Sequence, residues 1–319
     1  PPPLPPPPLP PPPQTHLPIL LATLLCFVVA SRRMLRGRAG ARSDKSASET
    51  GRISLRCSDE EAAQVRALES TLAAHGVHPA TAPHETVQAT LVRFLRACKG
   101  DAAAAEEMVA ADSVWREEHS IGKLLQRSAN EVLGCDEAIV QAVAPCVHVG
   151  VDRAGRPLIL KHMGSQCKIS KLLKHTSQER LLLYGARLNE GFVAALTDAG
   201  ASEWTIVIDA AGWHLGLFDS AAVIFLRNTA VADGAHHPER LAAMIVLNAP
   251  RVLAVAWGVI RTWIDAVTAD KIHILAEADK KGARDVLLRY AAPSQLPPHY
   301  GGTGGALPPT WPERGGVLD

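Results

Sequence analysis

Short runs of aliphatic and β-branched residues alternate with longer helical segments between residues 147 and 275. The strand-like runs cover residues 147–151, 158–161, 204–209, 244–247 and 272–275. Helices are predicted between them, over residues 176–196, 221–231 and 253–264. Strands that alternate with helices form a largely parallel sheet, because each helix returns the chain across the sheet before the next strand. The sequence therefore predicts an α/β fold with a mostly parallel sheet flanked by helices.

Three amphipathic helices are expected ahead of this sheet. Ser58 and the carboxylates after it start the first helix, which ends before Gly76. The second covers residues 85–97, and Asp101 caps the third, which runs to about residue 119. Apolar residues recur at helical spacing in all three, so the helices can share one core. We predict a small all-α domain at this place in the chain.

Six short segments of the chain form recognisable motifs. They are LVRFLRACKGD at 91–101 with Trp-Arg at 115–116, DRAGRP at 152–157, HPERL at 237–241, VLNAP at 246–250, WIDAVTADKIHIL at 263–275 and LPPHYGG at 296–302. They resemble LLRFLRARKFD with WR, DKDGRP, YPERL, INAP, FLDPVTVSKIFIL and LPxxFGG, the motifs of the CRAL-TRIO lipid-binding family, phosphatidylinositol-transfer branch. The resemblance implies a non-catalytic protein that holds one lipid in an apolar cavity and exchanges it at membranes.

The resemblance also sets the expected domain boundaries. Residues 59–130 correspond to the family's N-terminal helical domain, and residues 135–305 correspond to its lipid-binding domain. Residues 1–58 are expected to be a Pro-rich, apolar and Arg/Ser-rich segment without a packed core, and residues 306–319 a disordered tail.

A lipid cavity needs many apolar side chains. Burying a methylene group is worth about 0.8 kcal/mol, so two acyl chains need roughly 20 to 25 kcal/mol of matching surroundings. The strand at 204–209 and the helices around it carry such side chains, although most of them also suit an ordinary core. We predict that four residues belong to the cavity lining: Ile206, Ile208, Phe225 and Val259.

The predicted helix at residues 253–264 is apolar around nearly its whole circumference, with Arg261 as its only charge. Such a helix is either buried on both sides or alternates between burial and membrane contact. The resemblance implies the second role, a gate that opens at a bilayer. The residues assigned to this gate and to membrane contact are Leu253, Val255, Trp257, Ile260, Trp263 and Ile264.

The resemblance implies a headgroup site for phosphatidylinositol. The matching residues are Lys99, Glu239, Thr268 and Lys271. A lysine can neutralise the phosphodiester, while hydroxyl and carboxylate groups bind sugar hydroxyls. Cys98 stands where the family has an arginine, and Glu239 and Lys271 could instead be ordinary surface charges. A phosphatidylcholine site has less support, because Trp204 and Ile206 occupy its serine and threonine positions.

Composition and missing motifs exclude several other functions. The net charge of +1 and the 4% aromatic content argue against nucleic-acid binding. The sequence has no GxSxG, GxxxxGK[ST], HExxH or GxGxxG motif, so we predict no enzyme and no cofactor. His236 and His237 have only Asp233 and Glu239 as nearby carboxylates, so we predict no metal site. Six scattered cysteines without a CxxC pair suit reduced thiols in a cytoplasmic protein.

The first residues allow several interpretations. Residues 1–13 contain eleven prolines, and residues 17–30 are apolar but span only about 21 Å as a helix, short of the roughly 30 Å of a bilayer core. This part can be a membrane anchor, a cleaved signal, or a leader or disordered tail before Met34. If residues 1–13 belong to the mature chain, they can recruit a partner that binds proline-rich motifs.

We therefore predict a monomeric, cytoplasmic carrier that visits membrane surfaces transiently and binds phosphatidylinositol. One alternative is a carrier of a non-phospholipid, such as a sterol or a tocopherol- or retinoid-like molecule. Another is a membrane-associated signalling adaptor.

Overall fold

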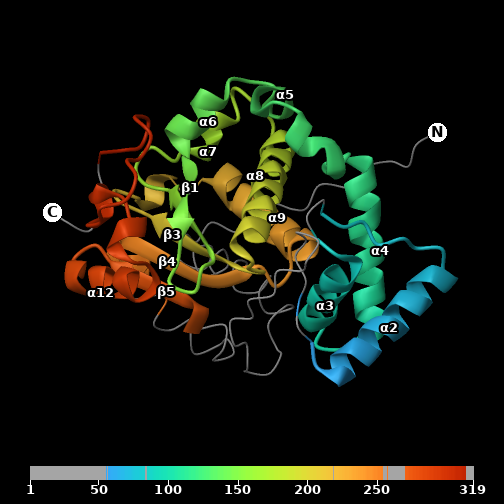
Figure 1. The fold of residues 1–319 in the computed structure, drawn as a ribbon. Coiled ribbons are helices and arrows are strands. Elements are labelled where there is room, and N and C mark those ends of the chain that lie inside the picture. The colour runs from blue at the N-terminus through green and yellow to red at the C-terminus, as the bar shows by residue number, and fades with distance from the viewer. Residues whose placement is uncertain are drawn as a thin grey trace.

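The computed structural model describes residues 55, 57–82, 85–217, 219–253, 257 and 270–313. Its centre is a sheet with the strand order β1-β2-β3-β4-β5 (Figure 1). The strands are β1 Cys146–Val151, β2 Pro157–His162, β3 Trp204–Asp209, β4 Leu241–Ala249 and β5 Ile272–Ala276. Strands β1 and β2 form an antiparallel hairpin, and every other neighbouring pair is parallel. The predicted mostly parallel α/β sheet is confirmed.

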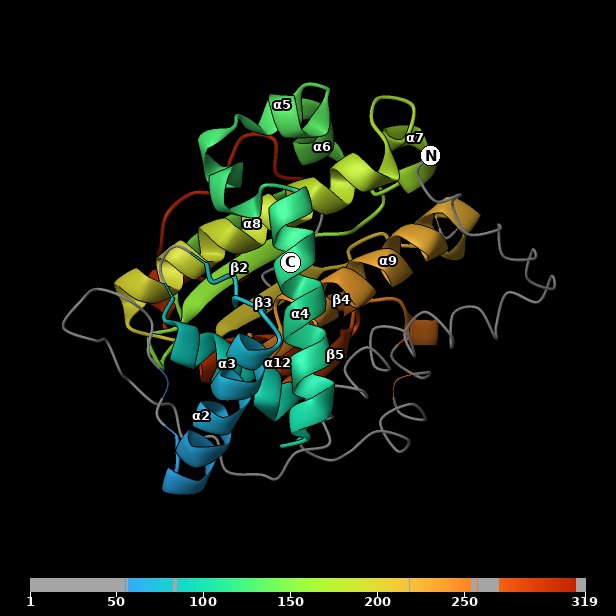
Figure 2. The ribbon, with the colours of Figure 1, turned by 90° about the vertical axis from the view of Figure 1, so that its right-hand side faces the viewer.

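Helices cover both faces of the sheet. Helix α12, Lys280–Tyr290, packs Val286 and Leu287 on one face, against alternate strand residues such as Leu160 and Ile245. Helix α8, Gln178–Ala199, lies on the opposite face and packs on Ile159. Helix α9, Ser220–His236, lies beside α8. The strands lie between α12 and the pair α8 and α9, as Figures 1 and 2 show.

The three predicted N-terminal helices are present and share one core. They are α2 Asp59–Ala74, α3 Val87–Ala97 and α4 Ala102–Glu118. Ser58 makes a reciprocal capping box with Glu61, and Asp101 accepts two backbone N–H bonds at the start of α4. Leu68 and Phe94 lie in the middle of the shared core and are fully buried.

Several short elements were not predicted from the sequence. They are η1 Ile121–Gln126, α5 Ala129–Leu133, α6 Glu137–Val143, α7 Ile169–Leu172, η2 Leu215–Leu217, α12, η4 Pro293–Gln295 and η5 Pro298–Tyr300. Most have two turns or fewer, too short for a periodic apolar pattern to stand out. Residues of η1, α5 and α6 pack against α8. At the start of α8, Ser177 accepts the N–H of Arg180, and the hydroxyl of Thr176 donates to the carbonyl of Leu133.

The predicted disordered tail at 306–319 is wrong for the part that the structure describes. Trp311 is 7% exposed and packs in the core beneath α12, with Leu307 beside it. The buried area of an indole stabilises this segment although it forms no helix or strand. Residues 314–319 lie outside the described residues.

Candidate functional site

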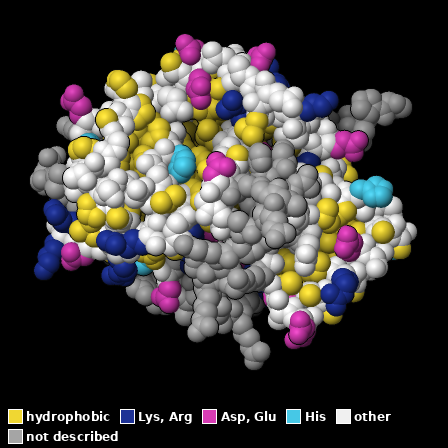
Figure 3. Space-filling model, viewed as in Figure 1, with side chains coloured by type: hydrophobic (Ala, Val, Ile, Leu, Met, Phe, Trp, Pro, Cys, Tyr) yellow, Lys and Arg dark blue, Asp and Glu magenta, His cyan; other side chains and the backbone are white. Residues whose placement is uncertain are grey.

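A cavity of about 450 Å³ lies between the sheet and helices α8 and α9. Strands β2, β3 and β4 supply its floor through Lys161, Ile206, Ile208 and Met244. Leucines of α8 and the residues Phe225 and Leu226 of α9 line it as well. Hydrophobic side chains gather around a hollow near α6 and α8 in Figure 3. The volume lies within the range of roughly 300 to 1,000 Å³ that is usual for pockets that bind small molecules.

Three of the four residues predicted to line a cavity lie in this lining. Ile206 and Ile208 alternate along β3 with Thr205 and Val207, which face the opposite side of the sheet. Phe225 reaches the cavity from α9. Val259 lies outside the described residues.

The predicted gate is described only in part. Leu253 is half-buried, and Trp257 is 6% exposed and packs against Met244, Val246 and Ile272 on the cavity face of the sheet. Val255, Ile260, Trp263 and Ile264 lie outside the described residues. Movement of this segment at a membrane stays a prediction.

The predicted headgroup residues Glu239 and Lys271 lie near each other. Glu239 has the left-handed backbone angle φ +57°, which is uncommon for a residue other than glycine. Burial raises the pKa of its carboxyl group, and the charge of Lys271 opposes that rise. The Lys271 ammonium donates to the carbonyl of Leu241 at 3.1 Å and lies 3.8 Å from Glu203 Oε1.

The structure describes only one of the other two predicted headgroup residues. Lys99 is exposed in the turn after α3, with the left-handed angle φ +60°. Thr268 lies outside the described residues. Arg96 was not predicted from the sequence. Its charge also lowers the pKa of Glu239, and it pairs with Glu61 at 2.8 Å. The signal was the second arginine of the RFLRA segment, one turn of α3 before Lys99.

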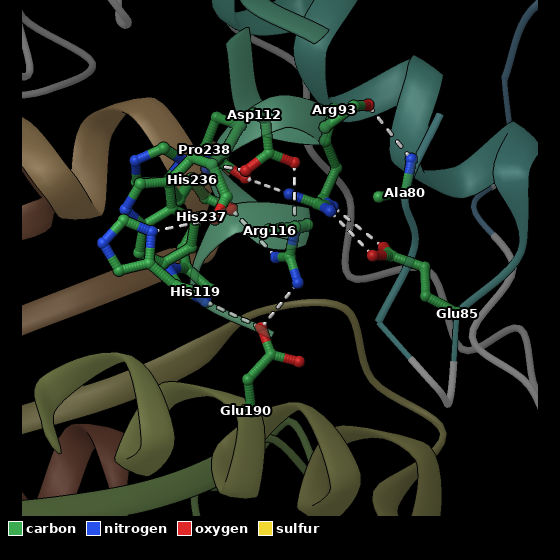
Figure 4. A network of polar contacts seen from close by, with 12 residues as sticks. Ala80, Glu85, Arg93, Asp112, Arg116, His119, Glu190, His236, His237 and Pro238 are labelled. Atoms are coloured by element: carbon green, nitrogen blue, oxygen red, sulfur yellow. Dashed lines mark hydrogen bonds and ion pairs between the residues drawn. The ribbon is translucent and has the colours of Figure 1, made fainter. Parts of the chain in front are cut away.

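Buried charges on α3 hold the loop that carries Glu239. Arg93 donates to the carbonyl of Pro238 at 2.9 Å and makes two bonds to Glu85, at 2.8 and 2.7 Å (Figure 4). Arg240, on the other side of Glu239, pairs with the same Glu85 at 2.8 Å. Both neighbours of Glu239 are therefore tied to one buried carboxylate and its arginine.

Helix α4 holds the preceding part of the same loop. Arg116 bonds to Asp112 and to Glu190 of α8, each at 3.0 Å. His236 Nδ1 lies 2.8 Å from Asp112, its ring stacks on Trp115, and His237 Nε2 lies 3.2 Å from Glu190 (Figure 4). Trp115 and both histidines also line the cavity. One wall of the cavity is therefore an interface with the N-terminal helices.

The charges in this network balance. Three arginines, Arg93, Arg116 and Arg240, face three carboxylates, Glu85, Asp112 and Glu190, and all six side chains are buried. Burial by itself would raise the pKa of the two glutamates. The neighbouring arginines, together with His237 at Glu190, outweigh it and lower the pKa of each to about 2. Burial, with the charge of Arg93, lowers the pKa of Arg240 to about 10, which leaves it protonated at neutral pH.

These shifts predict a loss of stability in acid. A carboxyl whose pKa is lower in the folded than in the unfolded chain contributes stability above the unfolded value, here 4.5, and loses it as the pH falls towards 2. We expect the free energy of unfolding to fall by several kcal/mol over that window. Urea unfolding at intervals between pH 6 and pH 2.5 measures it. An unfolding midpoint that stays constant down to pH 3 would contradict the assigned pairing.

Other features of the described part of the chain bear on function. It contains no group of three or more His, Cys, Asp or Glu side chains placed to hold a metal ion. None of its helices combines the length and the apolar character needed to cross a bilayer. Cys57, Cys98, Cys135, Cys146 and Cys167 are free thiols.

Comparison with known proteins identifies the fold and the family. The profile of the CRAL/TRIO domain matches residues 143–302, which is half of the chain and contains the sheet and the cavity. The chain belongs to the CRAL/TRIO domain family. This CRAL/TRIO protein also resembles the crystal structure of Sfh5, with a TM-score of 0.56 and 15% identity over 72% of this chain and 84% of that one. At that identity the likeness supports the fold alone.

Two curated relatives extend the match into the N-terminal helices. The Arabidopsis thaliana phosphatidylinositol/phosphatidylcholine transfer protein SFH9 is 29% identical over 222 residues, which cover 67% of this chain and 36% of SFH9. The SEC14 cytosolic factor of Eremothecium gossypii is 27% identical over 219 residues, which cover 67% of this chain and 68% of that protein. The CRAL/TRIO chain thus spans about a third of SFH9 and two thirds of the SEC14 factor.

Proposed function

We propose that this CRAL/TRIO protein is a non-catalytic carrier that binds one phospholipid, phosphatidylinositol, and exchanges it at membrane surfaces. The observation that carries the proposal is the apolar cavity between the sheet and helices α8 and α9. Its apolar lining removes acyl methylene groups from water, at about 0.8 kcal/mol for each. The name of SFH9, a phosphatidylinositol/phosphatidylcholine transfer protein, agrees with such a role.

The arrangement around Glu239 supports the choice of headgroup. Glu239 and Lys271 can bind the inositol hydroxyls and the phosphodiester, respectively, with Lys99 and Thr268 as the other proposed contacts. Arg93 bonds to Pro238 and Arg240 pairs with Glu85, so the backbone on both sides of Glu239 is held before any ligand arrives. A preorganised site loses less conformational freedom on binding than a mobile one does.

Exchange requires a way in and out of the cavity. We assign that movement to the segment 253–264, which carries Trp257 against the cavity face of the sheet. The protein would work as a monomer from the cytoplasm and contact membranes only during exchange. If residues 1–13 belong to the mature chain, they would add a site for a partner that recognises proline-rich sequences.

A smaller hydrophobic ligand is the second candidate. Trp204 and Ile206 stand on the strand where hydroxyl groups would favour phosphatidylcholine. Ile206 has no hydrogen-bond donor, and Trp204 carries a bulky indole in place of a hydroxyl. A volume of about 450 Å³ also suits a compact molecule such as a sterol or a tocopherol-like lipid.

Lipid transfer between vesicles tests the proposal. The full chain should accelerate the movement of labelled phosphatidylinositol from donor to acceptor vesicles, and mass spectrometry of the purified protein should find that lipid bound. Transfer or co-purification of a sterol-like molecule in its place would favour the second candidate. If no lipid co-purifies and none is transferred, the carrier proposal fails.

A further inference from the structure

The floor of the cavity carries one ammonium group among aliphatic side chains. The strand register places Lys161 of β2 beside Cys146 of β1 and Ile208 of β3, and Ile208 beside Val246 of β4. The next row on the same face contains Ile159, Ile206 and Met244. Because side chains alternate along a strand, Lys161 faces the cavity side together with Ile159, which packs under α8.

The surroundings of Lys161 supply no counter-ion. None of the described residues places a carboxylate within ion-pair distance of its ammonium group, and Lys161 is half-buried. Two carboxylates line the cavity elsewhere. Glu179 is exposed in the first turn of α8, and Asp233 accepts a bond from Asn189 at 2.9 Å. A partly desolvated charge without a partner is costly, and such groups are candidates for ligand binding.

Two further polar groups of the cavity lining, those of Cys146 and Thr229, can take part in ligand binding. Cys146 is the register partner of Lys161 on β1; burial raises the pKa of its thiol, and the charge of Lys161 opposes that rise. Thr229 on α9 lines the cavity, and its hydroxyl is buried without a hydrogen-bond partner. A ligand with a small anionic head could therefore find a cation and a neutral donor in an otherwise apolar space.

We propose that Lys161 binds the carboxylate of a single-chain lipid, a long-chain fatty acid, whose tail lies along Ile206, Ile208 and Phe225. This ligand would occupy the cavity when phosphatidylinositol is absent, with its head at the β1 side of the sheet. The inference rests on the proposed role of the cavity as a lipid site, but it does not depend on the headgroup residues Glu239 and Lys271. One cation and one buried hydroxyl in an otherwise apolar lining match a ligand with one small anionic group and an apolar tail.

Paired fluorescent probes test this site in the full chain. We expect cis-parinaric acid to bind roughly tenfold or more tightly than its methyl ester, because only the acid can form a charge-assisted bond. Lys161→Met should reduce that preference to about twofold or less, whereas Lys161→Arg should keep it. Lys281→Met, at an exposed position in the first turn of α12, is the matched control and should leave the preference unchanged. Equal binding of acid and ester by the unaltered chain would overturn the proposal. That comparison does not depend on whether any variant folds.

Competition experiments with the bound probe distinguish a fatty acid from a phospholipid as the source of the anionic head. Oleate should displace the bound probe, while vesicles that contain dioleoyl phosphatidic acid should not. Displacement by phosphatidic acid alone would overturn the assignment to a fatty acid. A strong preference for the acid together with no transfer of phosphatidylinositol would support Lys161 and count against the proposed headgroup, so the two failures are distinguishable.

Discussion

Replacing Arg116 with methionine should lower the free energy of unfolding by about 3 to 5 kcal/mol. The guanidinium group of Arg116 neutralises Asp112 and Glu190, which are 3% and 2% exposed, and it also lies 3.4 Å from the carbonyl of His236. Methionine fills a similar volume but leaves two buried carboxylates without their arginine. Urea unfolding followed by circular dichroism measures the change.

Arg96→Met provides the matched control for this prediction. Arg96 pairs with Glu61 at a similar distance, but its side chain is 36% exposed and that of Glu61 is 31% exposed. An ion pair so accessible to water contributes about 1 kcal/mol or less. The two variants remove the same side chain and differ in burial. If Arg116→Met unfolds at the same urea concentration as Arg96→Met, the buried network does not stabilise the interface as described.

The double variant Glu239→Ala and Lys271→Ala should lose phosphatidylinositol transfer by a factor of roughly a hundred or more, because each of the two charged hydrogen bonds is worth about 1.5 to 3 kcal/mol. The fold should remain, since the arginines beside Glu239 keep their own partner, Glu85. Initial rates of transfer between vesicles measure the effect, with circular dichroism as the check of folding.

Glu277→Ala with Lys281→Ala is the control for charge. Both residues are exposed near the end of β5 and the start of α12. This pair changes the composition by the same two residues and should transfer at the unaltered rate. If both double variants transfer phosphatidylinositol normally, Glu239 and Lys271 do not bind its headgroup, even though the cavity could still carry lipid.

The sheet could be predicted because its signals are local. The β-branched residues of β3 are bounded by turn residues on both sides, and the predicted and observed limits are both 204 and 209. Helix α9 was harder, since the prediction ended it at residue 231, whereas it runs to His236. Its last turn is held by Asp233 and His236, which bond to α8 and α4, respectively. No pattern within α9 itself contains that information.

Only those residues of the candidate site that lie in a family motif could be predicted. The motifs named Glu239 and Lys271, but they gave no sign of what holds the loop that carries Glu239. Glu85 was predicted to be the first residue of a helix. In the structure it is the buried ion-pair partner of both Arg93 and Arg240. Arg93 and Pro238 are 145 positions apart in the chain. Contacts at that separation follow from how the domains pack, which neither periodicity nor composition encodes.

The strand order β1-β2-β3-β4-β5 has a consequence for how the chain is made. In a doubly wound sheet, a central strand forms first and later strands add on both sides of it. Here each strand pairs with the one synthesised just before it, so the sheet can grow in one direction as the chain leaves the ribosome. A nascent chain would therefore add strands at one edge only, while the other edge stays the outer side of β1, which limits the surface open to wrong pairing during synthesis.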